Sequence, residues 1–347
     1  MRVFVPLSIP SPSEEWRILF QWEIVPGFTL TLHAYAVCIL VGIIAASLLT
    51  GRRLRVRGAD PGLVLDVGLW AVVFGIAGGR IFHVLTHPDD YFGEGKDLWK
   101  VFAIWEGGLA IFGALLLGAV GVFVGCRLSG LRFWTFADAL VPGLLLAQAF
   151  GRFGNYFNQE LFGLPTDAWF GLQIDRPNTA IPLGLSEDTL FLPTFLFEVI
   201  WNLIGVFLLI LAERRYTTAT DRPGLIAVGW RLQWGRLLGL YLVWYGTGRM
   251  FFESIRIDPS EILLGVRVNV WAAFAAVVIG LLLIVVQGRR HPGVEPSPYV
   301  PGHLDSDSAG VDSDDTYPDV DDDDDTRVVS AFSASALSAT SGAGAKP

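Results

Sequence analysis

Long runs of apolar residues, separated by short polar segments that are rich in arginine, fill most of the first 290 positions of the chain. A helix needs about 20 predominantly apolar residues to cross the hydrocarbon of a bilayer. The runs that reach this length lie at about residues 30–50, 63–85, 104–125, 133–151, 193–212, 237–255 and 269–287. The pattern therefore predicts an all-α polytopic membrane protein with about seven transmembrane helices, contained in a domain of residues 30–290.

The composition agrees with a lipid environment. Hydrophobic residues make up 52% of the chain and charged residues 17%, whereas soluble domains are about 25% charged. The net charge of -9 comes from the segment 291–347, which contains the run Asp321–Asp325. This segment cannot bury apolar surface, so we expect a disordered acidic tail. The remainder is nearly neutral, so the charge gives no sign of a nucleic-acid partner, for which clustered lysine and arginine would be expected.

The basic residues in the loops predict the orientation. Cytoplasmic loops of membrane proteins carry an excess of arginine and lysine. Here the richer loops follow the first, third, fifth and seventh predicted spans, for example within 52–57 and 214–236. This places the N-terminus outside and the acidic tail in the cytoplasm. Residues 1–29 are then expected to form an interfacial arm at the outer face, and the polar stretch 151–192 to include an outer-face subdomain.

One face of the sixth predicted span is polar. Tyr245, Arg249, Glu253 and Arg256 are spaced by four, four and three positions, which confines them to an arc of roughly 80° on a helix. Ionisable groups inside a membrane are costly, so this face has to meet a partner or a cavity. A salt-bridge stripe between helices is one interpretation. Two arginines against one carboxylate favour an anionic ligand.

The end of the fourth predicted span shows a second polar stripe if the helix continues beyond residue 151. Its members, again spaced by four, three and four positions, are Gln148, Arg152, Asn155 and Gln159. Gly151 and Gly154 interrupt the stripe, and glycine lets the backbone approach a bound group closely. The alternative is that the helix ends here in a solvated loop.

Other polar residues lie near the ends of spans. Arg80 and Glu106 are near the outer ends of the second and third spans, where they are placed to frame one outer-leaflet pocket. Glu198 and Asn202 lie one helical turn apart in the fifth span. His33 is isolated in the sequence, and an isolated histidine is more often a structural residue than a catalytic one.

The segment Gly151–Gly163 reads Gly-Arg-Phe-Gly-Asn-Tyr-Phe-Asn-Gln-Glu-Leu-Phe-Gly. This order of residues resembles the signature of the prolipoprotein diacylglyceryl transferases. Three further segments resemble the same family, and they are His33–Tyr35, Ile104–Leu109 and the polar face that begins at Tyr245. Together these segments cover residues 30–287. The resemblance also implies seven spans with the N-terminus outside.

The resemblance implies an enzyme of the bacterial plasma membrane whose active site lies toward the outer leaflet. It would transfer the diacylglyceryl group of phosphatidylglycerol to the lipobox cysteine of a prolipoprotein and release glycerol 1-phosphate, the first step of lipoprotein maturation. Phosphatidylglycerol, the prolipoprotein and membrane lipids are the implied partners, and no metal or cofactor is expected. The predicted catalytic residues are Arg152, Arg249, Glu160 and Glu253. Predicted to bind substrate, besides Arg152, are Asn155, Asn158, Gly163, Tyr35, Tyr245, Arg256, Arg80 and Glu106.

Arg152 and Arg249 suit a phosphate because the planar guanidinium matches phosphate oxygens with two parallel donors. The proton acceptor is less well defined. The family usually has a histidine, proposed as the base, shortly after the Gly-Gly-Leu of the third span, and this chain has Phe112 there. In the fifth span the chain keeps only the proline and the carboxylate of the family pattern, as Pro193 and Glu198. Candidate acceptors are Glu160, Glu253 and Glu106.

Functions of other classes lead to different expectations. A transporter or channel for an anionic solute is the main alternative, because buried arginines also line such pathways. An intramembrane serine hydrolase is weaker, because no Gly-x-Ser-x-Gly motif is present. A purely structural protein would have to explain arginine and carboxylate on one face in two separate spans.

Overall fold

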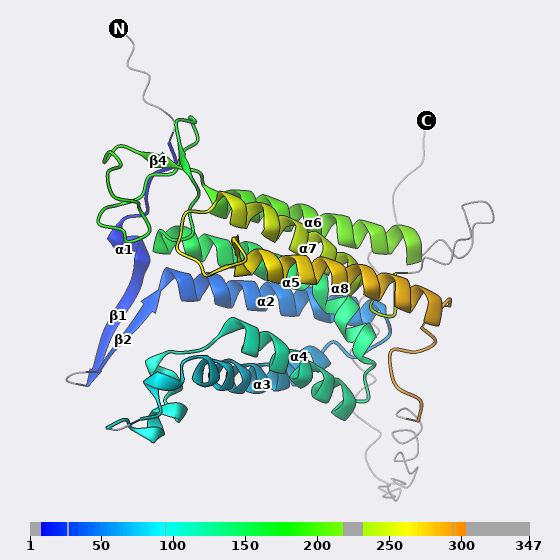
Figure 1. Ribbon diagram of the computed structural model, residues 1–347. Helices are drawn as coiled ribbons and strands as arrows, with labels where there is room; N and C mark the ends of the chain where they lie inside the picture. Colours follow the sequence, from blue (N-terminus) through cyan, green and yellow to red (C-terminus); the bar gives the residue numbers. More distant parts are fainter. Residues whose placement is uncertain (1–7, 26–27, 94, 218–231, 294, 303–347) are drawn as a thin grey trace, which may run out of the picture. The chain divides into compact units, whose positions relative to one another are not determined.

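The computed structural model describes residues 8–25, 28–93, 95–217, 232–293 and 295–302. Long helices dominate this part of the chain (Figure 1). They are α2 (Ala34–Val56), α3 (Leu63–Thr86), α4 (Ile111–Leu128), α5 (Phe133–Asn158), α6 (Thr194–Thr217), α7 (Arg236–Ile255) and α8 (Val268–Arg290).

Among the residues that the structure describes, six helices are long and apolar enough to cross a membrane: α2, α3, α4, α5, α6 and α8. The prediction of a helical polytopic membrane protein is confirmed. The remaining helix, α7, has 20 residues but carries Arg236, Arg249 and Glu253, so its composition is less apolar. A seventh span at α7 stays a prediction, as does the orientation of the termini.

Three predicted boundaries move. The first span begins at Ala34, because Phe28–His33 form strand β2. The third begins at Ile111, because Ile104–Glu106 form a short 3-10 helix, η3, and the glycines that follow have positive φ angles. The fourth continues beyond residue 151 to Asn158 and ends where Gln159 adopts a left-handed conformation with φ of 51°. The polar stripe of this span therefore lies on one continuous helix up to Asn158.

The helices pack chiefly in antiparallel pairs, α3 with α4, α2 with α5 and α7 with α8, and α5 also contacts α6 and α7 (Figure 1). Small residues bring the paired backbones close together. A Cβ atom on Gly78 of α3 would lie 2.3 Å from the carbonyl oxygen of Gly113 of α4, and one on Gly113 would lie 2.2 Å from the carbonyl oxygen of Gly78. This close approach is typical of helix pairs in membranes.

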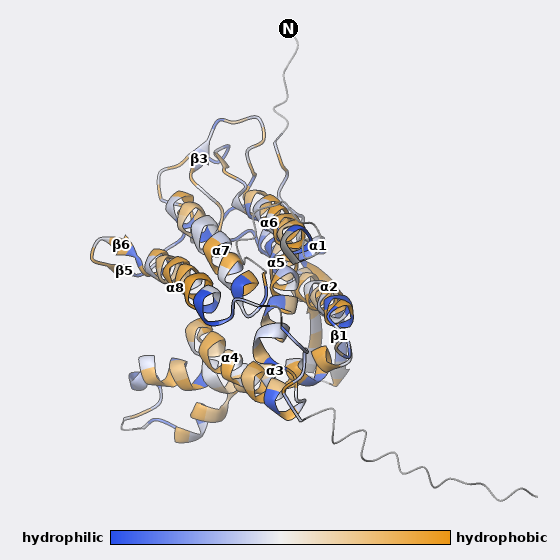
Figure 2. Ribbon diagram, turned by 90° about the vertical axis from the view of Figure 1, so that its right-hand side faces the viewer, coloured by the Kyte–Doolittle hydropathy of each residue, from blue (hydrophilic) through white to orange (hydrophobic). Residues whose placement is uncertain are grey.

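The outward faces of the helices are apolar (Figure 2). Leu48, Leu65 and Leu116 are 70%, 71% and 68% exposed. A soluble protein rarely exposes apolar surface over such contiguous areas. These faces fit contact with lipid chains.

Small elements gather near the first residues of α2 and the last residues of α5. A short helix, α1 (Glu14–Arg17), leads into β1 (Ile18–Val25), which pairs antiparallel with β2. In the segment that was predicted to include an outer-face subdomain, β3 (Pro165–Thr166) pairs with β4 (Leu190–Phe191). Phe162, Phe191 and Phe195 belong to a small hydrophobic core there. Between α7 and α8, β5 (Ile262–Leu263) pairs with β6 (Val266–Arg267).

The beginning of the predicted tail packs against the start of α5. The backbone N–H of Arg132 donates to the carbonyl of Pro298 at 2.8 Å, and Val300 N–H donates to the carbonyl of Gly130 at 2.9 Å. The Thr135 hydroxyl donates to Glu295 at 2.6 Å. Residues 303–347 lie outside the described residues, so the disordered acidic tail stays a prediction.

Candidate active site

The polar stripe of α5 lines a cavity of about 390 Å³ near the last turns of that helix. Residues of α2, α6, α7 and the first turn of α4 complete its wall. The side chains that line it are those of Tyr35, Ile111, Gln148, Arg152, Asn155, Leu161, Glu198, Trp201, Asn202, Tyr245, Arg249 and Phe252, with Gly151 and Gly248. Gly151 leaves the cavity open, because a Cβ atom there would meet nothing within 4 Å.

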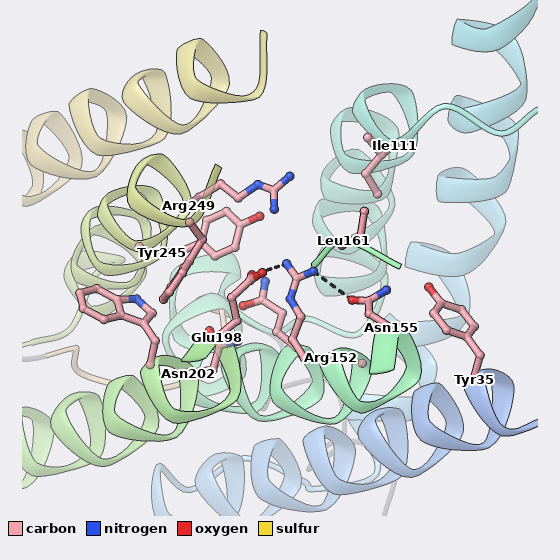
Figure 3. A pocket seen from close by; sticks show the side chains of 14 residues that line it. Tyr35, Ile111, Arg152, Asn155, Leu161, Glu198, Asn202, Tyr245 and Arg249 are labelled. Carbon is pink, nitrogen blue, oxygen red and sulfur yellow. Dashed lines mark hydrogen bonds and ion pairs between the residues drawn. The ribbon is translucent and has the colours of Figure 1, made fainter. Parts of the chain in front are cut away.

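Arg152 extends from α5 toward the middle of the cavity (Figure 3). Its Nη2 lies 2.6 Å from Glu198 Oε2, and its Nη1 donates to Asn155 Oδ1 at 3.0 Å. Glu198 is 5% exposed and comes from α6. A partly buried guanidinium is therefore held by a carboxylate on one side and an amide on the other, which fixes its direction.

Arg249 and Tyr245 enter the same cavity from α7, one helical turn apart (Figure 3). The Nη2 of Arg249 lies 2.8 Å from Glu253 Oε2. The structure thus brings Arg152 and Arg249, which are 97 positions apart in the sequence, to one cavity. Among the residues that line it, these two guanidiniums face a single carboxylate, Glu198.

Glu253 lies behind this wall and is fully buried. Besides Arg249, it contacts Arg256 at 3.5 Å and Arg267 at 3.4 Å, and it accepts a hydrogen bond from Asn269 Nδ2 at 3.0 Å. Three guanidiniums thus surround one carboxylate. Glu253 is placed to orient Arg249 and does not itself line the cavity.

Arg256, the last member of the predicted α7 face, does not line this cavity either. It makes two parallel hydrogen bonds to Asp258, from Nε to Oδ1 at 2.7 Å and from Nη2 to Oδ2 at 2.8 Å. Burial lowers the pKa of Arg256, but the hydrogen bond and charge of Asp258 and the charge of Glu253 outweigh it, so the net pKa is raised. Its donors are largely used within the fold.

A second cavity of about 730 Å³ adjoins the first at Tyr35, which lines both. Its lining residues are Arg17, Ile18, His33, Tyr35, Ala36, Asn158 and Glu160. Asn155 joins the two cavities, because its Nδ2 donates to Glu160 Oε1 at 2.7 Å while its Oδ1 accepts from Arg152. We call the first the arginine cavity and the second the outer cavity.

Three predicted site residues serve the surrounding loops. Arg80 donates to the carbonyls of Val101, Gly107, Gly108 and Lys100, and so ties down the segment that precedes α4. Glu106 is exposed in η3 and lines neither cavity. Gly163 packs where a Cβ atom would lie 2.8 Å from Leu192 Cβ and 3.1 Å from the carbonyl of Ile255.

At the first turn of α4, the position that departs from the family pattern turns away from the arginine cavity. The ring of Phe112 lies 6.4 Å from that of Phe82 of α3, whereas its neighbour Ile111 lines the cavity. Because phenylalanine has no titratable group, Phe112 cannot accept the proton of a thiol.

Nine of the fourteen lining residues are absent from the predicted site, and among them are Gln148, Glu198, Trp201 and Asn202. Gln148, Glu198 and Asn202 could have been recognised in the sequence, because they are polar side chains within apolar runs, where they need a partner. Trp201 could not have been recognised in this way, because aromatic side chains are common in membrane spans.

Fold and cavity together define a class: a polytopic membrane protein whose helices enclose a cavity with two inward-facing arginines. Comparison with known proteins narrows this class. The family model of the prolipoprotein diacylglyceryl transferases matches residues 23–286, and the chain belongs to this family. The family prediction from the sequence is confirmed.

Similar proteins carry one name. A phosphatidylglycerol–prolipoprotein diacylglyceryl transferase of Leifsonia xyli subsp. xyli is 56% identical over 302 residues, which cover 85% of each chain. A protein named as the second such transferase of Streptomyces coelicolor is 45% identical over 267 residues, covering 77% of this chain and 79% of the relative. Its counterpart from Cutibacterium acnes is 40% identical over 297 residues, covering 86% and 92%.

Proposed function

We propose that this chain transfers the diacylglyceryl group of phosphatidylglycerol to the lipobox cysteine thiol of a prolipoprotein. In this reaction the bond between the diacylglyceryl carbon and a phosphate oxygen breaks, and a carbon–sulfur bond forms. Glycerol 1-phosphate leaves, and the thiol proton passes to a base. The observation that carries the proposal is that Arg152 and Arg249, from separate helices, line one cavity in a member of this family.

The arginine cavity suits the phosphate of the lipid. A guanidinium has five N–H donors, and within the described residues Arg249 contacts Glu253 alone through Nη2. Donors of Arg152 and Arg249 are thus available to a phosphate between them. Fixed donors of this kind stabilise the charge that develops on the leaving oxygen. The Tyr245 hydroxyl and the Asn155 side chain supply neutral polar groups beside them.

Glu160 is the base that we propose. A free thiol has a pKa of about 8.5 and is mostly protonated near neutrality. Glu253 forms ion pairs with three arginines, and neither Glu253 nor Glu106 lines the arginine cavity or the outer cavity. Glu160 lines the outer cavity, and Asn155 connects it to Arg152. A cysteine that enters through the outer cavity would reach both the base and the bound lipid.

The same proposal includes the topology. We take α7 as the seventh span, whose polar groups are tolerated because they face the arginine cavity and the ion pairs around Glu253. The arginine-rich ends of the helices, as at Arg52 and Arg214, would face the cytoplasm of a bacterial plasma membrane. Both cavities lie at the opposite ends of these helices, so the reaction would occur toward the outer leaflet.

A direct test is mass spectrometry of a lipobox peptide incubated with the purified protein in vesicles that contain phosphatidylglycerol. We expect a diacylglyceryl mass gain with the wild-type chain. Arg152→Ala and Arg249→Ala should lower the rate about 100-fold or more, the usual effect of removing a donor to a developing anion. Arg127→Ala is the matched control, because Arg127 is exposed at the end of α4 and lines neither cavity.

Full activity in either cavity variant would contradict the phosphate clamp. The absence of any mass gain with the wild-type chain, together with flux of an anionic solute in the same vesicles, would instead support a transporter.

A further inference from the structure

A pair of stacked tryptophans joins α6 and α7 at one wall of the arginine cavity. The rings of Trp201 and Trp244 lie 4.1 Å apart at an interplanar angle of 15°. Each indole N–H donates to the other's backbone carbonyl, at 3.4 Å from Trp201 and 3.3 Å from Trp244. The polar atoms of both rings are thus satisfied within the pair, and its remaining surface is apolar.

Two glycines make room for this stack. A Cβ atom on Gly205 would lie 2.4 Å from Nε1 of Trp244, and one on Gly248 would lie 2.2 Å from Nε1 of Trp201. Any larger side chain at either position would force the rings apart. The backbone is therefore shaped on both helices to hold the two indoles at this junction.

On the other side of Trp201 lies an apolar groove of about 470 Å³ between α6 and α7. From α6 it is lined by Trp201, Gly205, Leu208, Leu209, Leu211 and Ala212, and it ends at Arg215. From α7 it is lined by Leu240, Val243, Trp244 and Thr247. The Thr247 hydroxyl donates to the carbonyl of Val243 at 2.8 Å, so it offers no unsatisfied donor to the groove.

The groove is long enough to hold a lipid chain that extends across one leaflet. Trp201 and Arg215 are fourteen positions apart, which on a helix spans about 21 Å at about 1.5 Å per residue. The hydrocarbon of one leaflet is about half of a total of roughly 30 Å. The groove starts beside the arginine cavity and runs along α6 toward the arginine-rich ends of the helices, the direction in which the chains of an outer-leaflet lipid point.

Two adjoining spaces of opposite polarity therefore share Trp201 as a wall. One presents guanidiniums and the other an apolar channel, so together they match an anionic headgroup with an attached acyl chain. We propose that the groove between α6 and α7 binds an acyl chain of the phosphatidylglycerol substrate, with the Trp201–Trp244 stack at the junction with the headgroup. This inference rests on the proposed function and adds a subsite that selects phosphatidylglycerol by the length of its acyl chain.

Filling the far end of the groove tests the proposal. Leu211 lines it and is 46% exposed, so Leu211→Trp is compatible with folding. Relative to wild type, we expect this variant to lose about tenfold in kcat/KM with a phosphatidylglycerol of sixteen-carbon chains and less than twofold with one of eight-carbon chains. Leu203→Trp is the control, because Leu203 is also 46% exposed on α6 but does not line the groove.

Thr247→Trp, close to the junction, should lower transfer from both lipids. An unchanged chain-length preference in Leu211→Trp, or unchanged transfer from both lipids in Thr247→Trp, would overturn the proposal, because a groove filled only by bulk lipid would not affect transfer from the substrate.

A binding measurement separates this inference from the proposed function. Phosphatidylglycerol with a diazirine at the end of one acyl chain should crosslink to groove residues such as Leu208 and Ala212. Phosphatidylcholine with the same chain should label them at least fivefold less, because its headgroup is not a net anion. Equal labelling by the two lipids would overturn the proposal. Selective labelling without any transfer to peptide would retain the subsite and contradict the transferase function.

Discussion

Arginines with little exposed surface lie at both ends of the helix bundle, Arg53 at one end and Arg152 and Arg249 at the other, but their hydrogen bonds are used differently. At the end away from the arginine cavity and the outer cavity, Arg53 lines a third cavity of about 450 Å³. There it donates to the carbonyls of Ala139 and Asp138, both at 2.8 Å, and pairs with Glu213 at 2.5 Å. At the cavity end, Arg249 has one described partner, Glu253. An arginine whose donors are all used by the fold stabilises the fold, whereas an arginine with donors directed into a cavity can bind a ligand.

The largest expected effects come from Arg249 and Arg53. We expect Arg249→Ala to lower transfer about 100- to 1,000-fold with little change in the Tm measured in detergent. Arg53→Ala should instead reduce the free energy of unfolding by about 3–5 kcal/mol, because it leaves Glu213 and two carbonyls without this donor. Its activity per folded molecule should stay near wild type. The comparison would fail if both variants lost activity and stability to the same extent.

The two carboxylates Glu160 and Glu253, both near the arginine cavity, are expected to differ in the same way: one acts in the reaction and the other holds an arginine in place. Glu160→Gln should lower the rate about 100-fold and remove the rise of activity with pH that a base produces. Glu253→Gln should keep that rise, because Glu253 is held by three arginines and only orients Arg249. Profiles of kcat/KM against pH for the two variants check this. An unaltered rising limb in Glu160→Gln would exclude Glu160 as the base.

Two glycines of α5 should give smaller and separable effects. A Cβ atom on Gly154 would lie 2.6 Å from the Tyr35 ring, which lines both cavities, so Gly154→Ala should lower activity about tenfold by shifting that ring. A Cβ atom on Gly143 would lie 2.9 Å from the carbonyl of Ala46. Gly143→Ala should therefore cost about 1–3 kcal/mol of stability and leave kcat unchanged. Rates and Tm values of the two variants, measured together, decide between these expectations.

The smallest effect is expected at the opposite end of α5. Thr135→Ala removes the hydrogen bond to Glu295, which should reduce the free energy of unfolding by about 1 kcal/mol. Transfer activity should not change, because neither residue lines the arginine cavity or the outer cavity. A loss of activity in a stably folded Thr135→Ala variant would show that the two ends are coupled.

Much of the fold could be predicted from the sequence, because the hydrocarbon of a bilayer imposes strict rules on length and polarity. Six of the seven apolar runs correspond to helices that are long and apolar enough to span. The remaining run, the sixth along the chain, is helix α7, and its charged face makes it less apolar. The β1–β2 hairpin was not predicted, since its aromatic residues also suit a segment that lies flat at an interface.

The candidate site could be predicted in part. Spacing places Tyr245 and Arg249 on one face of a helix and predicts a second polar stripe with Arg152 and Asn155. The family resemblance then assigns both stripes to one site. Spacing does not separate Arg249 from Arg256, although the first enters the arginine cavity and the second is held by Asp258. Glu198 had a signal as a carboxylate within a span, but nothing in the sequence identifies Arg152 as its partner.

By itself, then, the sequence determined where the chain is apolar enough to enter a membrane, which helix faces carry charge, and to which family the chain belongs. The first two properties are local, since they depend on composition and on the 3.6-residue period of a helix. The third depends on the order of residues within short motifs. Only the tertiary structure decided which charged faces meet, which arginine donors are already used, and that Trp201 separates a polar cavity from an apolar groove. Those outcomes depend on contacts between helices that are far apart in the sequence, and no local pattern encodes them.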